Sequence, residues 1–177
     1  MIDPDRVRLA RVERNHWQTL RELAATIWHE HYAHIISSAQ IAFMLGERFS
    51  DAGLEQLAED PSYELAMLWS GEQAVGYCGS GPADDTSLFK LGQLYLLGHL
   101  RGQGLGQLML SHVEQRAQGA GASTLVLQVN KRNTLAIAFY RRQGFTVREA
   151  AVFDIGNGFV MDDYVMEKPL AGILPTA

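Results

Sequence analysis

The stretch from Leu94 to Gly106 constrains the fold most, because an apolar run leads directly into three alternating glycines. The run predicts a strand, and the glycines predict a tight turn because a residue without Cβ lets the backbone turn closely. Beyond the turn, apolar residues recur at spacings of three and four, the pattern of an amphipathic helix: Leu105, Leu108, Met109, Val113 and Ala117. Unpaired amides and the positive dipole end of a helix N-terminus favour a phosphate or pyrophosphate, so this turn predicts a phosphorylated cofactor.

Two common phosphate-binding motifs do not fit this turn. The pattern G-x-x-x-x-G-K-[ST] is absent, and G-x-G-x-x-G fails because Gln107 stands where the last glycine belongs. ATP and NAD are therefore disfavoured as ligands. A glycine turn that only joins a strand to a helix is the alternative interpretation.

Hydrophobic periodicity predicts an α/β fold over the whole chain. Strands are expected at residues 7–12, 63–69, 74–79, 88–97, 125–129, 147–155 and 159–167, and helices at 17–28, 41–49, 54–58, 105–117 and 134–142. Residues 125–129 are almost wholly apolar, as in a parallel strand buried on both faces, so the elements around the glycine turn form a right-handed crossover. The expected architecture is a three-layer sandwich with a central mixed, mostly antiparallel sheet flanked by helices.

Local signals mark where these elements begin and end. We expect helix caps at Asn15, at Ser37 in a capping box with Gln40, and at Asn133 or Thr134. Further signals are a left-handed cap at Gly144, a long loop over residues 79–87 and a tight turn over residues 156–158.

Two motifs resemble those of the GCN5-related N-acetyltransferases (GNAT). The run from Arg101 to Gly106, R-G-Q-G-L-G, resembles the family signature [Q/R]-x-x-G-x-[G/A], whose amides hold the pyrophosphate of acetyl-coenzyme A. The stretch from Gln128 to Phe145 resembles the family's next motif at six matching positions: Asn130, Asn133, Ala136, Tyr140, Gly144 and Phe145. The resemblance is firm from about Ala74 onward and looser in the N-terminal third.

The resemblance implies acetyl-coenzyme A as co-substrate and a set of cofactor-binding residues. They are Leu96, Leu97, Arg101, Gly102, Gln103, Gly104, Leu105, Gly106, Asn130, Asn133, Ala136 and Tyr140. Within this set, backbone N–H groups at Leu96 and Leu97 are expected to polarise the thioester carbonyl, because fixed amides stabilise a developing oxyanion without reorganising.

Tyr140 is the predicted general acid that protonates the departing thiolate. A phenol has an ordinary pKa of ~10, close to the ~8.5 of a thiol, so the proton transfer is nearly balanced. The alternative is that Phe139 and Tyr140 form an aromatic pair in the core, and spacing alone favours this alternative. The family match at Tyr140 favours the acid.

The general base is left open by the sequence. Many relatives carry a glutamate on the strand before the glycine turn, where this chain has Lys90, Gly92 and Gln93. The candidates are Glu30, His31, Asp84, Asp85, Asp162, Asp163 or an ordered water chain, and each acid could equally be a solvated surface group.

The histidines His29, His31 and His34 do not predict a metal site. His29 and His31 would not share a helix face, and H-E-x-x-H is not matched. Partly exposed histidines at a helix end are the simpler interpretation. The resemblance adds that His31 and Tyr32 border the acceptor pocket.

Composition limits the class of protein. The chain has 177 residues, 47% of them hydrophobic, which predicts one domain spanning residues 1–177. A net charge of −5 without a basic cluster argues against nucleic-acid binding. We expect no signal peptide or membrane span, and the lone Cys78 favours a cytoplasmic protein and gives no support for an acyl-enzyme.

The sequence therefore predicts an N-acetyltransferase that moves an acetyl group directly to a primary amine of a small, cationic acceptor. The negative charge and the acids Asp154, Asp162 and Asp163 would attract a cation. The run H-E-H-Y and the C-terminal pattern also resemble the polyamine-acetylating branch of the family. The alternatives are a peptide or protein N-acetyltransferase and a non-catalytic acyl-coenzyme A sensor, and a homodimer is compatible with each.

Overall fold

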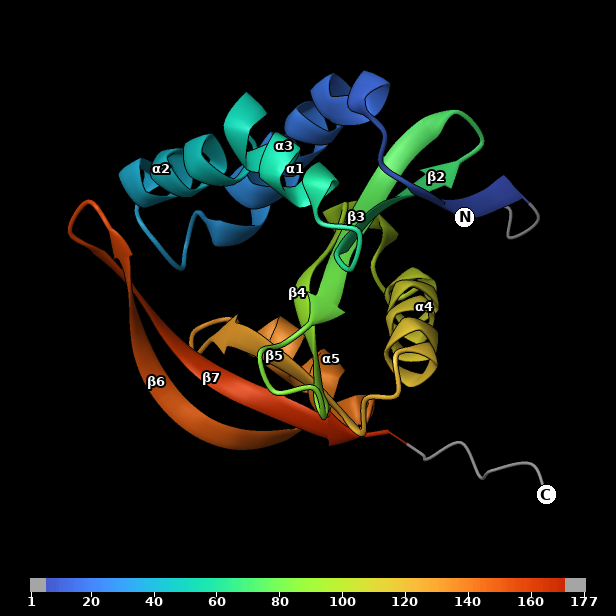
Figure 1. Cartoon of the computed structure of the whole chain (residues 1–177). Helices are drawn as coiled ribbons and strands as arrows, with labels where there is room; N and C mark the ends of the chain where they lie inside the picture. The colour runs from blue at the N-terminus through green and yellow to red at the C-terminus, as the bar shows by residue number, and fades with distance from the viewer. Residues whose placement is uncertain (1–5, 171–177) are drawn as a thin grey trace. The chain divides into compact units, whose positions relative to one another are not determined.

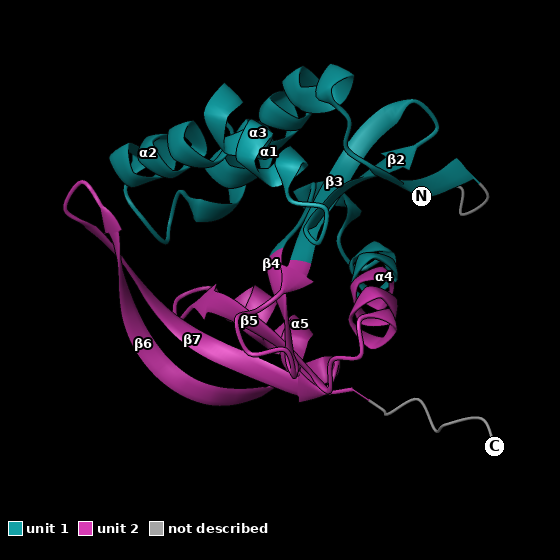
Figure 2. Cartoon of the chain, in the orientation of Figure 1, with its two compact units in different colours: residues 1–80, 93–110 teal, residues 81–92, 111–177 magenta. Residues whose placement is uncertain are grey.

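The computed structural model describes residues 6–170 and has an α/β fold with one mixed, seven-stranded sheet in the order β1-β2-β3-β4-β5-β7-β6 (Figure 1). Two compact units divide the chain, as Figure 2 shows: residues 1–80 with 93–110, and residues 81–92 with 111–177. Strand β4 (Leu88–Leu96) and helix α4 (Leu105–Gly119) contribute residues to both units.

The first unit combines an antiparallel β-meander with three helices. Its elements are β1 (Val7–Arg11), the 3₁₀ turn η2 (Arg14–His16), α1 (Trp17–Tyr32), α2 (Ser38–Arg48), α3 (Asp51–Glu59), β2 (Glu64–Ser70), most of β3 (Gln73–Pro82) and the 3₁₀ turn η3 (Gly98–Leu100). Strand β2 pairs with β1 on one side and with β3 on the other. The five central residues of β2 are buried, as expected of an inner strand.

The helix starts of this unit follow the predicted caps with one exception. The Ser37 hydroxyl accepts a hydrogen bond from the Gln40 N–H at 3.1 Å, which confirms the predicted cap of α2. The prediction for Asn15 is wrong, because Asn15 lies inside η2 and α1 begins after His16. The His16 N–H donates to the Glu13 carbonyl. This bond closes the turn that contains Asn15.

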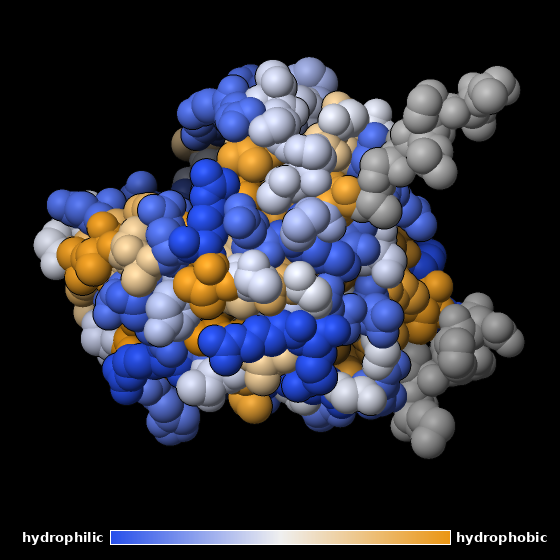
Figure 3. Space-filling model, turned by 90° about the horizontal axis from the view of Figure 1, so that it is seen from below, coloured by the Kyte–Doolittle hydropathy of each residue, from blue (hydrophilic) through white to orange (hydrophobic). Residues whose placement is uncertain are grey.

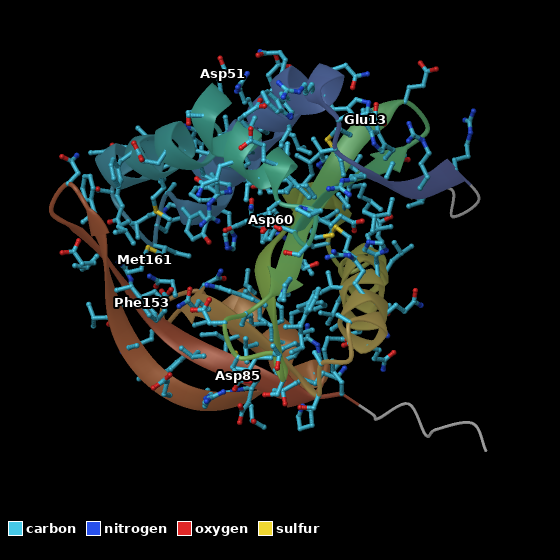
Figure 4. All side chains as sticks on the ribbon, viewed as in Figure 1. Glu13, Asp51, Asp60, Asp85, Phe153 and Met161 are labelled. Carbon is cyan, nitrogen blue, oxygen red and sulfur yellow. The ribbon has the colours of Figure 1, made fainter. Side chains whose placement is uncertain are left out.

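Helix α1 is fixed to β3 by a buried polar contact among aromatic rings. The Trp28 indole N–H donates to the Tyr77 hydroxyl at 2.8 Å, and both side chains are fully buried. Phe49 packs edge-on against both rings. A second tie is the ion pair between Arg21 of α1 and Asp51 at the start of α3 (labelled in Figure 4).

The second unit is built on β5 (Thr124–Asn130), α5 (Thr134–Arg142), β6 (Thr146–Gly156) and β7 (Phe159–Pro169). Strand β5 runs parallel to β4 from the pair Leu88–Thr124 to the pair Leu91–Leu127, which confirms the predicted parallel strand. On its other side β5 is antiparallel to β7, and β7 forms a hairpin with β6. The hairpin turn has positive φ at residues 156–158, as the glycines and Asn157 predict.

The loop predicted for residues 79–87 is shorter than expected. Strand β3 continues to Pro82, and a turn at Asp85 and Ser87 leads into β4. The Asp85 carboxylate (labelled in Figure 4) accepts from the Ser87 N–H at 2.9 Å and from its hydroxyl at 2.7 Å. This local turn replaces the long loop, because one aspartate satisfies the backbone there.

Candidate active site

The glycine turn leaves the backbone uncovered at the start of α4. Gly102 and Gly104 have φ of 78° and 82°, a conformation that favours glycine. No atom of the described residues lies within 4 Å of where a Cβ would stand on either. The Leu108 N–H makes the bond to the Gly104 carbonyl that starts the helical ladder, so the amides before it have no partner within the helix. This is the geometry that an anionic phosphate group requires.

Arg101 connects this turn to the end of α1. Its Nη2 lies 3.3 Å from Nδ1 of His31, so the structure brings together a predicted cofactor residue and a predicted acceptor residue. Arginine only donates hydrogen bonds, so a hydrogen bond here needs the His31 Nδ1 as its acceptor. The Gln103 side-chain amide donates to the His99 carbonyl at 3.5 Å.

The end of β4 corrects one part of the prediction for Leu96 and Leu97. The Leu97 N–H donates to the Val75 carbonyl at 3.0 Å and is therefore not available to polarise a thioester. Val75 is the extra residue of a β-bulge in β3, because Leu68 pairs with Gly76 and Trp69 with Ala74. Successive N–H groups of a strand point to opposite edges, so the Leu96 amide points away from β3 and is the one left for this role.

Tyr95 contacts a predicted acceptor residue, although the sequence analysis did not single it out. Its hydroxyl lies 3.0 Å from that of Tyr32, the second predicted acceptor residue, and its ring packs beside Trp28 and Tyr77. Tyr95 is half-buried, directly before Leu96. Its position within the apolar run was the available signal, but the partner 63 positions away could not be read from the sequence.

The predicted asparagines form the turn after β5. The Asn130 side-chain oxygen accepts from the Arg132 N–H at 2.9 Å, and the Asn133 oxygen accepts from the Ala136 N–H at 3.2 Å. Asn133 is therefore the cap of α5, and Thr134 is the first helical residue. Both asparagines are buried, so each has a structural role beside the predicted contact with the cofactor.

Tyr140 lies two turns into α5 and is buried to 7% exposure. Its ring centroid is 5.3 Å from that of Phe139 and 5.5 Å from that of Phe145, so the aromatic packing expected of the structural alternative is present. Gly144, with φ of 90°, lets the chain turn so that the Phe145 N–H donates to the Tyr140 carbonyl. The ring is thus held in place, as a positioned acid also requires.

Most of the candidate bases are committed elsewhere or exposed. Asp162 pairs with Lys131, and the Ser87 hydrogen bonds lower the pKa of the Asp85 carboxyl below its ordinary value. Asp84 is exposed on the same loop. Glu30 is exposed and packs its carboxylate against Gly98.

Asp163 on β7 differs from these groups. It is buried to 5% exposure, and within residues 6–170 its Oδ1 has no hydrogen-bond partner. Burial and, less strongly, the Asp162 charge raise the pKa of the Asp163 carboxyl, the Lys131 charge lowers it, and the net value is about 6.

Comparison with known proteins identifies the family of this chain. Residues 17–145 match the family described as "Acetyltransferase (GNAT) family". The chain belongs to the GNAT family. It is 28% identical over 135 residues to an uncharacterised N-acetyltransferase of Mycobacterium tuberculosis, covering 76% of this chain and 85% of the relative. A mycothiol acetyltransferase of Corynebacterium glutamicum is 32% identical over 92 residues, half of this chain and 30% of that protein.

Solved structures of GNAT enzymes share the fold. The PaiA N-acetyltransferase from Thermoplasma acidophilum, in complex with coenzyme A, superimposes with a TM-score of 0.77 at 21% identity, covering 92% of this chain and 98% of that one. The ribosomal-protein-S18-alanine N-acetyltransferase from Escherichia coli gives a TM-score of 0.66 at 16% identity, with 97% and 98% covered. These structures agree in fold with the family match, which identifies this chain as an N-acetyltransferase with acetyl-coenzyme A as co-substrate.

The glycine turn of this GNAT chain fits that co-substrate. The open space over Gly102 and Gly104 can take the pyrophosphate, with the first amides of α4 as donors. When bound, acetyl-coenzyme A supplies the acetyl group in activated form, as a thioester. Within residues 6–170, no three His, Cys, Asp or Glu side chains cluster so as to hold a metal ion. No helix in that range is long and apolar enough to span a membrane.

Proposed function

We propose that this N-acetyltransferase transfers the acetyl group directly from acetyl-coenzyme A to a primary amine of a small, cationic acceptor. The observation that carries the direct transfer is the open glycine turn at the start of α4, because it can hold the cofactor while the reaction proceeds. The only cysteine, Cys78, is buried in β3, so it is a poor candidate for an acyl-enzyme nucleophile.

The cationic character of the acceptor is supported by charge. The chain has a net charge of −5, and Asp162 and Asp163 follow each other on β7. Asp154, which the sequence grouped with them, accepts from the Gly156 N–H at 2.8 Å and so has a turn-forming role. The peptidyl-lysine N-acetyltransferase YjaB of Salmonella typhimurium is 34% identical over 67 residues, 37% of this chain and 43% of that protein, and makes peptides the second acceptor class to test.

The residues have distinct roles in this proposal. The amides of the glycine turn hold the pyrophosphate, and the Leu96 amide polarises the acetyl carbonyl. Tyr140 donates a proton to the thiolate as the amine displaces it, and Asn130 and Asn133 keep α5 and its tyrosine in position. His31, Tyr32 and the newly found Tyr95 border the acceptor.

Replacing Tyr140 by phenylalanine tests this assignment. A positioned proton donor contributes ~10²–10⁴-fold in rate, so Tyr140→Phe should lower kcat by this range while coenzyme A still binds. The assay measures free thiol released with polyamines, amino acids, aminoglycosides and peptides as acceptors. Tyr164→Phe, which removes a hydroxyl from a half-buried β7 tyrosine, is the matched control.

The same assay separates the alternatives. A fully active Tyr140→Phe enzyme would reduce Tyr140 to a packing residue. Turnover with peptides only would replace the small acceptor, and coenzyme A binding without turnover of any amine would support the sensor.

A further inference from the structure

Asp163 lies on β7, the strand between β5 and β6 in the second unit. It pairs with Asn130 of β5 on one side and with Ala151 of β6 on the other. Side chains alternate along a strand, so Met161 lies on the same face of β7, beside its cross-strand partner Phe153 (both labelled in Figure 4). The cross-strand neighbours of Asp163 are thus an amide and an alanine, and the next pair along this face, Met161 and Phe153, is apolar.

This arrangement is unfavourable for folding alone. A buried carboxylate oxygen without a hydrogen-bond donor loses its hydration and gains no partner in return. Such groups persist where a function needs them, because a ligand can supply the missing donor. An ammonium group is the ligand that an orphan carboxylate oxygen matches best in both charge and hydrogen bonding.

The charged groups around Asp163 can be named strand by strand. The charge of Asp162, the preceding residue on β7, disfavours a negative charge on Asp163. Lys131, the residue after β5, favours a negative charge on Asp163. On β6 the acid on the same face is Glu149. It is exposed and pairs with Val165, which lies two residues after Asp163 on β7. Burial outweighs these groups, and a carboxylate poised near neutral pH is suited to take and release protons.

We propose that Asp163 is the general base that accepts the proton of the acceptor's ammonium group. This inference rests on the proposed function. It assigns the general base, for which the strand before the glycine turn supplies no carboxylate. Its geometric basis is the buried Oδ1, which has no hydrogen-bond partner among residues 6–170 and lies opposite Asn130, where β5 ends and the turn to α5 begins.

The proton and electron pairs balance as follows. The ammonium gives one proton to Asp163, and the neutral nitrogen forms the C–N bond to the acetyl carbon. The C–S bond breaks with its electron pair on sulfur, which takes the Tyr140 proton. The second nitrogen proton restores the Tyr140 hydroxyl, and Asp163 releases its proton to solvent. The net products are the amide, the free thiol and one proton.

The test compares Asp163→Asn with Asp162→Asn, which removes the same charge from the adjacent exposed residue. For a polyamine acceptor at pH 7, Asp163→Asn should lower kcat/KM by ~10²–10⁴-fold, the usual contribution of a general base. The acidic limb of the wild-type pH profile should lie near the Asp163 pKa of about 6. This limb should vanish in Asp163→Asn, whose rate should rise with pH until the free amine predominates.

The adjacent charges give a second readout that a structural role would not produce. Asp162→Asn should keep the acidic limb and move it to lower pH, because the Asp162 charge raises the pKa of Asp163. Lys131→Met should move it to higher pH, because the lysine lowers that pKa. An acceptor whose amine is already neutral at the assay pH should lose less rate in Asp163→Asn.

Folding stability provides a readout that is independent of activity. The Asp163 pKa is raised from 3.8 to about 6 by folding, so between these values the folded chain binds more protons than the unfolded chain. Stability contributed by this group therefore falls as pH rises through that window. Asp163→Asn should melt at a higher temperature than wild type at pH 7, and the difference should disappear below pH 4.

The outcomes are separable. An Asp163→Asn enzyme that keeps the acidic limb, or that is less stable than wild type at pH 7, would overturn the inference and leave the proposed function intact. Absence of amine acetylation by the wild type would overturn the proposed function and the inference together.

Discussion

Gly76 on β3 lies where the next strand comes unusually close. A Cβ at this position would stand 2.7 Å from the Tyr95 carbonyl oxygen and 3.2 Å from a methyl group of Leu96. The bulge at Val75 and the bond from the Leu97 N–H to the Val75 carbonyl lie directly beside it. Because Gly76 has no side chain, β3 can pack closely against the residues that lead to the glycine turn.

Adding one methyl group tests this close approach. Gly76→Ala should lower the free energy of unfolding by ~1–3 kcal/mol, the usual cost of overpacking, as measured by chemical denaturation. Gly46→Ala is the matched control, because nothing lies within 4 Å of its Cβ position and it sits in α2. That control should gain about 0.5–1 kcal/mol from helix propensity, so losses of equal size in both variants would contradict the close-contact explanation.

At the scale of single elements, α5 shows how one short helix can carry both structure and chemistry. Its nine residues begin after the Asn133 cap and end where Gly144 turns the chain. Short helices are marginal by themselves, so the cap and the packing of Tyr140 against Phe145 determine whether this helix forms. The placement of the proposed acid depends on a hydrogen bond two turns before it.

The two possible caps of α5 can be distinguished by alanine substitution. Asn133→Ala should cost about 1 kcal/mol of unfolding free energy because it removes the acceptor for the Ala136 N–H. Thr134→Ala, at the first helical position and exposed, should change stability little. Both are measured without coenzyme A, so that a lost cofactor contact does not contribute. Equal effects of the two substitutions would show that the cap contributes nothing.

At the scale of the whole molecule, charge is the property that most affects the choice of acceptor. On the face shown in Figure 3, the hydrophobic residues among those described occur in small groups separated by hydrophilic ones. The net charge of −5 acts on any approaching cation, and carboxylates near a pocket raise the local concentration of cationic substrate.

Salt dependence tests this electrostatic contribution. The kcat/KM for spermidine should fall steeply as ionic strength rises, because the screening length shortens from ~8 Å at 0.15 M to ~3 Å at 1 M. An amine of similar length with an uncharged tail is the control and should be less sensitive. Parallel salt dependence of the two substrates, measured as steady-state rates, would reject the polycation proposal and favour peptides.

The sequence by itself determined the features that depend on a few neighbouring residues. The left-handed glycines at 102, 104 and 144, the caps at Ser37 and Asn133 and the turn at residues 156–158 follow from local dihedral preferences and short-range hydrogen bonds. The buried parallel strand was predictable because a run apolar on both faces has few other solutions. The cap at Asn15 failed because the Glu13–His16 turn competes with it over the same residues.

Only the tertiary structure decided which distant groups meet and which are left without a partner. The contact between Arg101 and His31 spans 70 positions, and the Tyr32–Tyr95 hydroxyl pair spans 63. The pairing of the Leu97 amide depends on the bulge in a neighbouring strand. The five candidate carboxyls look alike in the sequence, since the pKa of a carboxyl is set by burial and nearby charge. Strand register buries Asp163 opposite Asn130 and leaves Asp162 beside Lys131.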